Sequence, residues 1–517
     1  MLELPLDIWY RIIIYDLESE KNVLLSLALV SHSISELALD ILWREQISLR
    51  PFYSVINSYS LSHYPPRRIL AEEGGVKDNW GQWFSEPGLV LLEPLSDQVE
   101  SRVRSYLYRI RKLKIKPGCP WVSTMLTLLE SCVKFSDPVF PNLKDLHLSF
   151  STAEEMTSND IYSLLPLLPP SLQKVDLHLR KIQPPVIVEL LNLVKTLACG
   201  VEQLHFTGPE DPEVFSALGS FTTLRDLAVS HNECATRTVS IMTATEFVTP
   251  LTALHSLALD LGAFRLREGE SPTPSINFLV LKNLRLDGTA QDIQDFLHRV
   301  RSSSVRRVTF AFNDHEAHYV PYTACFTNVI SAFPDAREIR LEFRGSQSAV
   351  QLTYRHLLPL KKLPLQQFSL FQVADKVPHR LNEDEISSLV RAWPRLTHFS
   401  LLSWSFAYRA DILIAFSELQ YLEHLEIYLN LRSIVVSPGH VDWSGMRAST
   451  ITSPLEQLNL DEARCLPTHT MEIYTLLRHL LELFPRLRSI SSGEDASFLQ
   501  KQLDELICMW TQSPGSY

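Results

Sequence analysis

The chain has 517 residues, of which 45% are hydrophobic and 21% charged, which is the composition of a globular protein and excludes wholesale disorder. Its 59 acidic and 48 basic side chains give a formal net charge of −11, which argues against a nucleic-acid partner because phosphate contacts need a basic surface. With only 16 glycines the sequence has little material for phosphate-binding loops, so we expect a binding protein rather than an enzyme, with no cofactor.

The cysteines and the apolar segments indicate the compartment. The seven cysteines are odd in number and no two form a C-x-x-C pair, so they predict neither a zinc site nor a disulfide framework. No signal-peptide pattern begins the chain, and no uninterrupted apolar run reaches the roughly 20 residues of a membrane span. We therefore expect a soluble protein of the cytoplasm or nucleus with reduced thiols and no membrane partner.

The first fifty residues predict three short helices separated by polar breaks. Pro5 and Asp7 suit the first turn of a helix, and Ile8 follows on its apolar side. Apolar residues then dominate 23–30 and recur at helical spacing over 34–43. Three such helices are too small to bury their apolar surface alone, so they either cap the chain that follows or dock onto a partner.

Three motifs give these helices a specific resemblance. They are Leu-Pro-x-Asp-Ile at 4–8, Leu-Ala-Leu-Val-Ser at 27–31 and Leu-Trp at 42–43. Residues 2–46 thereby resemble the F-box, although many family members carry an aromatic or basic residue soon after the Val-Ser pair, where this chain reads His-Ser-Ile. The resemblance implies docking on the Skp adaptor, and through it on a cullin scaffold, in an SCF-type ubiquitin ligase. The residues that would face the adaptor or brace those that do are Leu4, Pro5, Ile8, Leu24, Leu27, Val30 and Trp43.

An irregular connection is predicted over 47–105. Its stretch 67–101 is rich in glycine and proline and contains Trp80 and Trp83. We favour packing of this tryptophan pair on the first repeats over a contact site for a partner.

A short pattern, apolar-x-x-apolar-x-apolar, then recurs fourteen times, on average about 29 residues apart. Alternating apolar residues are typical of a half-buried strand. The motifs begin at Ile110, Leu143, Leu172, Val201, Leu224, Leu254, Leu281, Val305, Ala336, Leu365, Leu396, Leu422, Leu455 and Leu487.

Helical patterns lie between these strands, as at 186–198, 292–300, 383–393 and 471–484. Proline stops a helix and favours extended geometry in the residue before it. An aromatic side chain at that preceding position can fill the space between the helix and the next strand. Such pairs occur at Phe140-Pro141, Phe333-Pro334, Trp393-Pro394 and Phe484-Pro485.

One strand and one helix per repeat resemble the leucine-rich-repeat family over about 106–492. The family's Asn after the strand is matched only by Asn232, so a perfectly regular horseshoe is not expected. The predicted fold is an α/β repeat solenoid of about 14 repeats, an arch with parallel strands inside and helices outside. An amphipathic segment within 493–517 is predicted to cap the last repeat, as solenoids need.

Two clusters on the predicted strand face are candidate sites. Phe371, Leu402 and Tyr428 fall on three consecutive repeats and would form an apolar stripe that a target protein could bind, unless a loop covers it. His147, His178 and His205 lie on neighbouring repeats, but strands two repeats apart are roughly 10 Å apart, which favours solvated histidines over a metal site. No catalytic motif stands out.

Together these patterns predict a non-catalytic receptor. The F-box resemblance implies a substrate-recognition subunit of an SCF-type ligase, whose solenoid binds an unknown target protein. The alternative is a leucine-rich-repeat interaction scaffold whose N-terminal helices only cap the solenoid. Degenerate repeats behind such a motif are similar to the large fungal F-box families.

Overall fold

The computed structural model describes the chain in segments that fall into two compact units, Met1–Thr236 and Arg237–Tyr517. The described residues are 21–29, 32–52, 55–56, 96–115, 120–131, 138–150, 161–180, 182–231, 239–240, 246–262, 264–265, 276–313, 322–344, 352–372, 381–402, 408–409, 412–430, 453–460, 470–491 and 496–512.

Over its described part, unit 1 contains a ladder of six parallel strands joined by helical connections. The strands are β1 (Glu45–Gln46), β2 (Lys112–Ile115), β3 (Asp145–Ser149), β4 (Lys174–His178), β5 (Gln203–Gly208) and β6 (Asp226–His231). The helices are α2 (Lys21–Leu27), α3 (His32–Arg44), α5 (Asp97–Leu107), α6 (Pro120–Ser131), α8 (Pro184–Leu197) and α9 (Pro212–Gly219), with a 3₁₀ turn at Leu165–Leu167.

The described part of unit 2 contains nine parallel strands in one ladder. They are β8 (Ser256–Asp260), β11 (Asn283–Gly288), β13 (Arg307–Phe312), β14 (Glu338–Phe343), β15 (Gln367–Gln372), β16 (His398–Leu402), β18 (His424–Ile427), β20 (Gln457–Asn459) and β21 (Ser489–Ser491). The helices are α11 (Ala290–Leu297), α12 (Tyr322–Ala332), α13 (Tyr354–Leu357), α14 (Glu383–Arg391), α15 (Ile412–Ser417), α17 (Thr470–Leu483) and α18 (Ala496–Gln512), with a 3₁₀ turn at Leu358–Lys362. Three two-residue pairs are β7 (Val239–Ser240) with β9 (Phe264–Arg265), β10 (Ile276–Asn277) with β12 (Val300–Arg301) and β17 (Tyr408–Arg409) with β19 (Leu429–Asn430).

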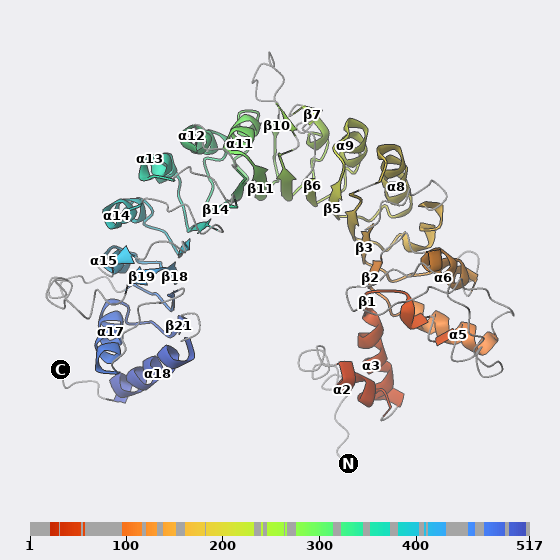
Figure 1. Ribbon diagram of the computed structural model, residues 1–517, viewed down its shortest axis with the longest axis horizontal. Coiled ribbons are helices and arrows are strands. Elements are labelled where there is room, and N and C mark those ends of the chain that lie inside the picture. The colour runs from red at the N-terminus through yellow and green to blue at the C-terminus, as the bar shows by residue number, and fades with distance from the viewer. Residues whose placement is uncertain are drawn as a thin grey trace, which may run out of the picture. The chain divides into compact units, whose positions relative to one another are not determined.

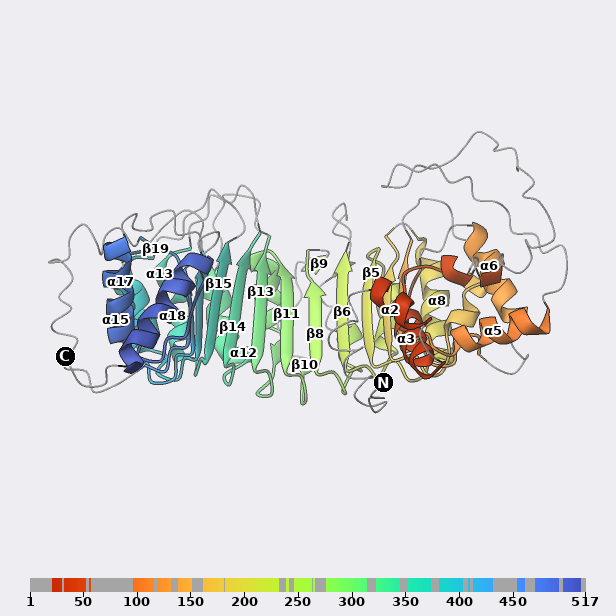
Figure 2. The same ribbon diagram turned by 90° about the horizontal axis from the view of Figure 1, so that it is seen from below.

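All fourteen predicted strands are present, so the α/β repeat solenoid is confirmed. Each strand begins two residues after the first apolar residue of its motif, as β3 does after Leu143, and these first residues are all buried. Within each unit the helices between successive strands lie on one side of the ladder and leave the other face of the strands uncovered by them, whereas α2, α3 and α18 lie at the ends of the ladders (Figure 1; Figure 2). No helix among the described residues is long and apolar enough to cross a membrane.

The aromatic residues that precede proline are buried as predicted. Phe140, Phe333 and Phe484 are fully buried, and Trp393 is 1% exposed. Trp393 Nε1 also donates a hydrogen bond to the backbone carbonyl of Leu360 at 3.1 Å, which ties the end of α14 to the preceding repeat. The four predicted helices appear as α8, α11, α14 and α17.

Helix α18 lies where the sequence predicts a C-terminal cap. Its Leu499 and Leu503 are buried, and Gln500 bonds the last strand. Gln500 Oε1 accepts from the Ile490 amide at 2.8 Å, and its Nε2 donates to the Arg488 carbonyl at 2.9 Å. The helix therefore satisfies backbone groups that an edge strand would leave open.

The predicted domain ranges can be compared with the structure at two places. Helix α5 lies largely inside the predicted irregular connection 47–105, whereas Trp80 and Trp83 lie outside the described residues. The division between the two units, after Thr236, falls inside the stretch 106–492 that the repeat pattern presents as one array. Asn232 also lies outside the described residues.

Helix α11 carries a carboxylate whose removal should stabilise unit 2. Burial raises the pKa of Asp295 to about 6, even though Gln291 donates it a hydrogen bond. A raised pKa favours folding below the unfolded value of 3.8, and this contribution is lost as the pH rises through about 6. Asp295→Asn should therefore raise the free energy of unfolding by roughly 1–2 kcal/mol at neutral pH. Urea denaturation at several pH values would measure this, and a gain that persists below pH ~4 would contradict the assignment.

Candidate protein-binding surfaces

The two N-terminal helices of the described chain, α2 and α3, form a helical hairpin with apolar groups on both its inside and its outside. Leu24 and Ile41 are buried between them, and Leu27 is half-buried against this core. On the outside, Leu25 is 54% exposed and Leu29, just after α2, is 89% exposed. Two largely exposed leucines four residues apart offer apolar surface to a partner.

The helical hairpin is also joined to the first strands of unit 1. Strand β1 follows α3 directly and pairs in parallel with β2. Arg109 forms ion pairs with Glu36 and Asp40 of α3, and these bonds leave only 13% of its side chain exposed. Trp43 stacks on Tyr106 of α5, with ring centroids 4.2 Å apart and planes 5° apart. Helix α3 is therefore held firmly against α5 and β2.

These contacts locate part of the predicted adaptor-binding set. Leu24 is inside the helical hairpin, Leu27 is at its edge, and Trp43 packs toward α5. Leu24 and Leu27 therefore hold α2 and α3 together, and Trp43 joins α3 to α5. The other four, Leu4, Pro5, Ile8 and Val30, lie outside the described residues. Adaptor binding by this set remains a prediction.

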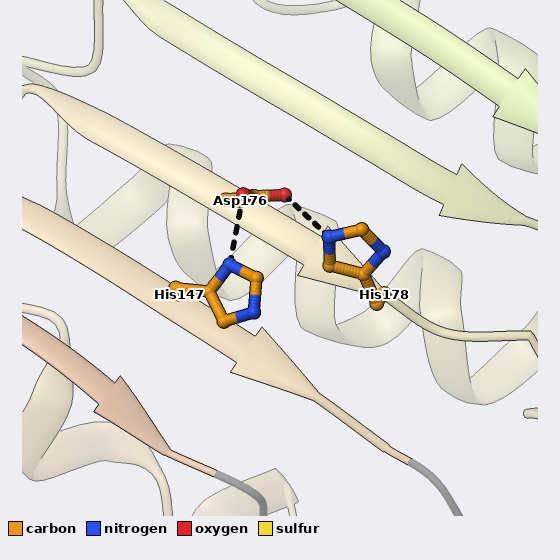
Figure 3. A group of neighbouring side chains, drawn as sticks. All are labelled: His147, Asp176 and His178. Atoms are coloured by element: carbon orange, nitrogen blue, oxygen red, sulfur yellow. Dashed lines mark hydrogen bonds and ion pairs between the residues drawn. The ribbon is translucent and has the colours of Figure 1, made fainter. Parts of the chain in front are cut away.

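A second group lies on the strand face of unit 1, where Asp176 of β4 lies between two imidazoles (Figure 3). His147 Nδ1 lies 2.8 Å from Asp176 Oδ2, and His178 Nε2 lies 3.1 Å from Asp176 Oδ1. His147 is the registered neighbour of Asp176 on β3, and His178 follows two residues later on the same face of β4. We call these three residues the histidine cluster.

In unit 2 the predicted apolar stripe keeps its expected register. Phe371 of β15 pairs with Leu402 of β16, and Tyr428 comes directly after Ile427, the partner of Leu401. All three side chains are half-buried, so each leaves part of its apolar surface on the strand face. Binding of a target protein by this stripe remains a prediction.

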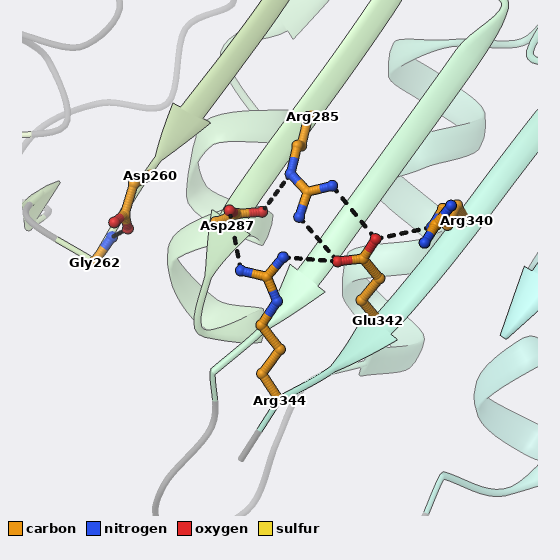
Figure 4. Close-up of polar contacts among 7 residues, drawn as sticks. All are labelled: Asp260, Gly262, Arg285, Asp287, Arg340, Glu342 and Arg344. Carbon is orange, nitrogen blue, oxygen red and sulfur yellow. Dashed lines mark hydrogen bonds and ion pairs between the residues drawn. The ribbon is translucent and has the colours of Figure 1, made fainter. Parts of the chain in front are cut away.

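Charged side chains flank the stripe in an arginine–carboxylate network, formed by Arg285, Asp287, Arg340, Glu342 and Arg344 (Figure 4). At its centre Glu342, 9% exposed, forms ion pairs with three arginines, each at 2.8 Å: Arg285, Arg340 and Arg344. Arg285 also contacts Asp287 at 3.1 Å. Burial alone would raise the pKa of Glu342, but the three guanidinium groups outweigh burial and lower it.

Short residues on the intervening strand make this network possible. Arg285 reaches Glu342 across β13, where the residues between them are the short Thr309 and Ala311. At the far side, the Arg340 guanidinium lies 4.3 Å from the centroid of the Phe371 ring. Sequence reasoning did not find the network, although opposite charges on strands that flank short residues were a readable signal.

The comparisons with known proteins concern the fold alone. No protein-family model and no curated protein matches the chain. Among solved structures, the leucine-rich repeat-containing protein LegL7 from Legionella pneumophila is similar at 13% identity with a TM-score of 0.32, covering 67% of this chain and 94% of its own. The LRR protein LIC12759 from Leptospira interrogans is similar at 14% identity with a TM-score of 0.30, covering 77% and 93%. Scores this low carry no functional argument, so the fold assignment rests on the strand ladders.

Proposed function

We propose that this chain is a non-catalytic receptor of an SCF-type ubiquitin ligase, which docks a Skp-type adaptor through the helical hairpin and holds a target protein on the strand face of unit 2. The observation that carries the proposal is the exposure of Leu25 and Leu29 within the F-box-like motif. The partly exposed apolar stripe supports target binding on the strand face. Such a receptor acts by raising the effective concentration of the target near the ligase, so it needs no catalytic residue of its own.

A second candidate is an interaction scaffold whose helical hairpin only caps unit 1. The ion pairs of Arg109, the stacking of Trp43 on Tyr106 and the pairing of β1 with β2 favour it, because they join α3 to the first strands. These contacts use the side of α3 that faces α5 and β2, and they leave Leu25 and Leu29 exposed. The two candidates therefore differ in what binds these leucines.

Substitution of the exposed leucines tests the proposal directly. Leu25→Asp/Leu29→Asp should weaken binding of a purified Skp-type adaptor by more than about 100-fold, because two leucines lose a buried environment in the complex and each is worth about 1.5–3 kcal/mol. The side chains are exposed in the free chain, so its melting temperature should stay unchanged. Co-expression followed by pull-down and calorimetric titration would measure both.

A matched control is Leu279→Asp in unit 2, an equally apolar residue that is 76% exposed. It should leave adaptor binding intact. If the unsubstituted chain is folded, monomeric and binds no adaptor, the receptor role is wrong and the capped scaffold is the better account. If the control weakens binding as much as the double variant does, the contact is non-specific.

A further inference from the structure

The histidine cluster has the donor atoms and the spacing of a metal site. One ligand atom from each of His147, Asp176 and His178 lies within 4.8 Å of the other two. All three side chains project from the strand face and are partly shielded, with 27%, 22% and 36% of the side chain exposed. Two imidazoles and one carboxylate are a ligand set that zinc and related divalent ions accept.

The charge of the ligand set suits a cation. Asp176 places one carboxylate between the two imidazoles. Imidazole binds metals in its neutral form, so two imidazole ligands and one carboxylate carry a single negative charge, which a divalent cation more than compensates.

We propose that His147, Asp176 and His178 form a site for a divalent ion of the zinc class, with His147 Nδ1, one oxygen of Asp176 and His178 Nε2 as ligands. Each ring must then carry its proton on the other nitrogen, so the metal replaces the hydrogen bond between His147 and Asp176 and the 3.1 Å contact between His178 and Asp176. Three protein ligands leave a fourth tetrahedral position open on the strand face, for water or for an atom of a bound molecule. This proposal does not rest on the receptor role.

The movement that the ion requires is small. Tetrahedral ligands at Zn–N and Zn–O distances near 2.0–2.1 Å lie about 3.3 Å apart. The two N···O distances, 2.8 and 3.1 Å, are close to this value, but they reach different oxygens of Asp176, Oδ2 and Oδ1. Binding through one oxygen therefore requires the carboxylate to turn and the two rings, whose centroids are 4.9 Å apart, to tilt toward each other, and the partial exposure of the three side chains leaves room for this.

A second group in unit 2 provides a matched comparison. His398, Glu423 and His424 also lie within 4.8 Å of one another. The rings of His398 and His424 stack with their centroids 4.2 Å apart. His398 Nδ1 also forms a hydrogen bond with Thr397 Oγ1 at 2.8 Å. Because stacked rings direct their nitrogens side by side rather than toward one point, we expect this group not to bind the ion.

The test is titration of the full chain, free of any affinity tag, with Zn²⁺ by calorimetry and with Co²⁺ by visible absorption. One equivalent should bind, and Co²⁺ should give the intense bands of a tetrahedral site. His147→Ala, His178→Ala and Asp176→Asn should each abolish this equivalent while the circular dichroism spectrum stays unchanged; Asp176→Asn keeps the side-chain shape and so separates loss of a ligand from loss of structure. His398→Ala should bind as the unsubstituted chain does. Binding that survives all three cluster variants, or that disappears only with His398→Ala, overturns the proposal, as does a chain that binds no Zn²⁺.

Discussion

Replacing Trp393 with alanine should lower the free energy of unfolding of unit 2 by about 3–5 kcal/mol. The side chain is 1% exposed, and its ring lies against Phe368 with centroids 5.0 Å apart. Alanine would leave a cavity between two repeats and would also remove one of the two donors to the Leu360 carbonyl, the other being the Leu363 amide. Urea denaturation of the full chain, followed by far-UV circular dichroism, would measure the loss.

Trp393→Phe is the control that separates packing from hydrogen bonding. Phenylalanine keeps a buried aromatic ring but removes one of the two hydrogen bonds to the Leu360 carbonyl, which still accepts from the Leu363 amide, so the loss should cost about 0.5–1.5 kcal/mol. The alanine variant should therefore be clearly less stable than the phenylalanine variant. Equal stability of the two would mean that the ring contributes nothing beyond its N–H, and that the space-filling role predicted for the aromatic-proline pairs is wrong.

The sequence predicts the repeat array well because one physical rule governs every repeat. A strand with one face on the core must alternate apolar and polar residues, and the residue that leads into it must also be buried. Leu172 and Leu396 illustrate this: each is buried, and β4 and β16 each begin two residues later. Helices such as α8 and α17 follow from the same burial requirement at helical spacing.

Contacts that depend on neighbouring repeats could not be predicted in this way. Strand β1 has only the polar residues Glu45 and Gln46, so no alternation marks it; it forms because the end of α3 reaches the open edge of β2. The histidine cluster was missed for a related reason. The spacing of the strands keeps His147 apart from His205, whereas Asp176, on the strand between them, joins His147 to His178.

The second large effect is expected at the centre of the arginine–carboxylate network. Glu342→Gln should lower the free energy of unfolding of unit 2 by about 2–3 kcal/mol at pH ~7, because hydrogen bonds between charged groups are worth more than neutral ones, and Glu342 accepts from Arg285 and Arg344 and is ion-paired with Arg340. Glutamine keeps the shape but loses the charge. The matched control is Glu418→Gln, which removes a pair with Arg391 in which both side chains are well exposed, and which should cost no more than about 0.5 kcal/mol.

The pH dependence of this loss identifies its cause. Because the pKa of folded Glu342 lies below the usual 4.5, its charge stabilises the fold above pH 4.5, and this contribution is lost as the pH falls through the folded pKa. The difference between the unsubstituted chain and Glu342→Gln should therefore be largest near neutral pH and shrink in acid, where glutamate is protonated and resembles glutamine. Urea denaturation of both proteins between about pH 3 and 7 would measure this. A difference that stays constant across that range would mean that the substitution acts through packing, since only the ionised carboxylate holds the three arginines together.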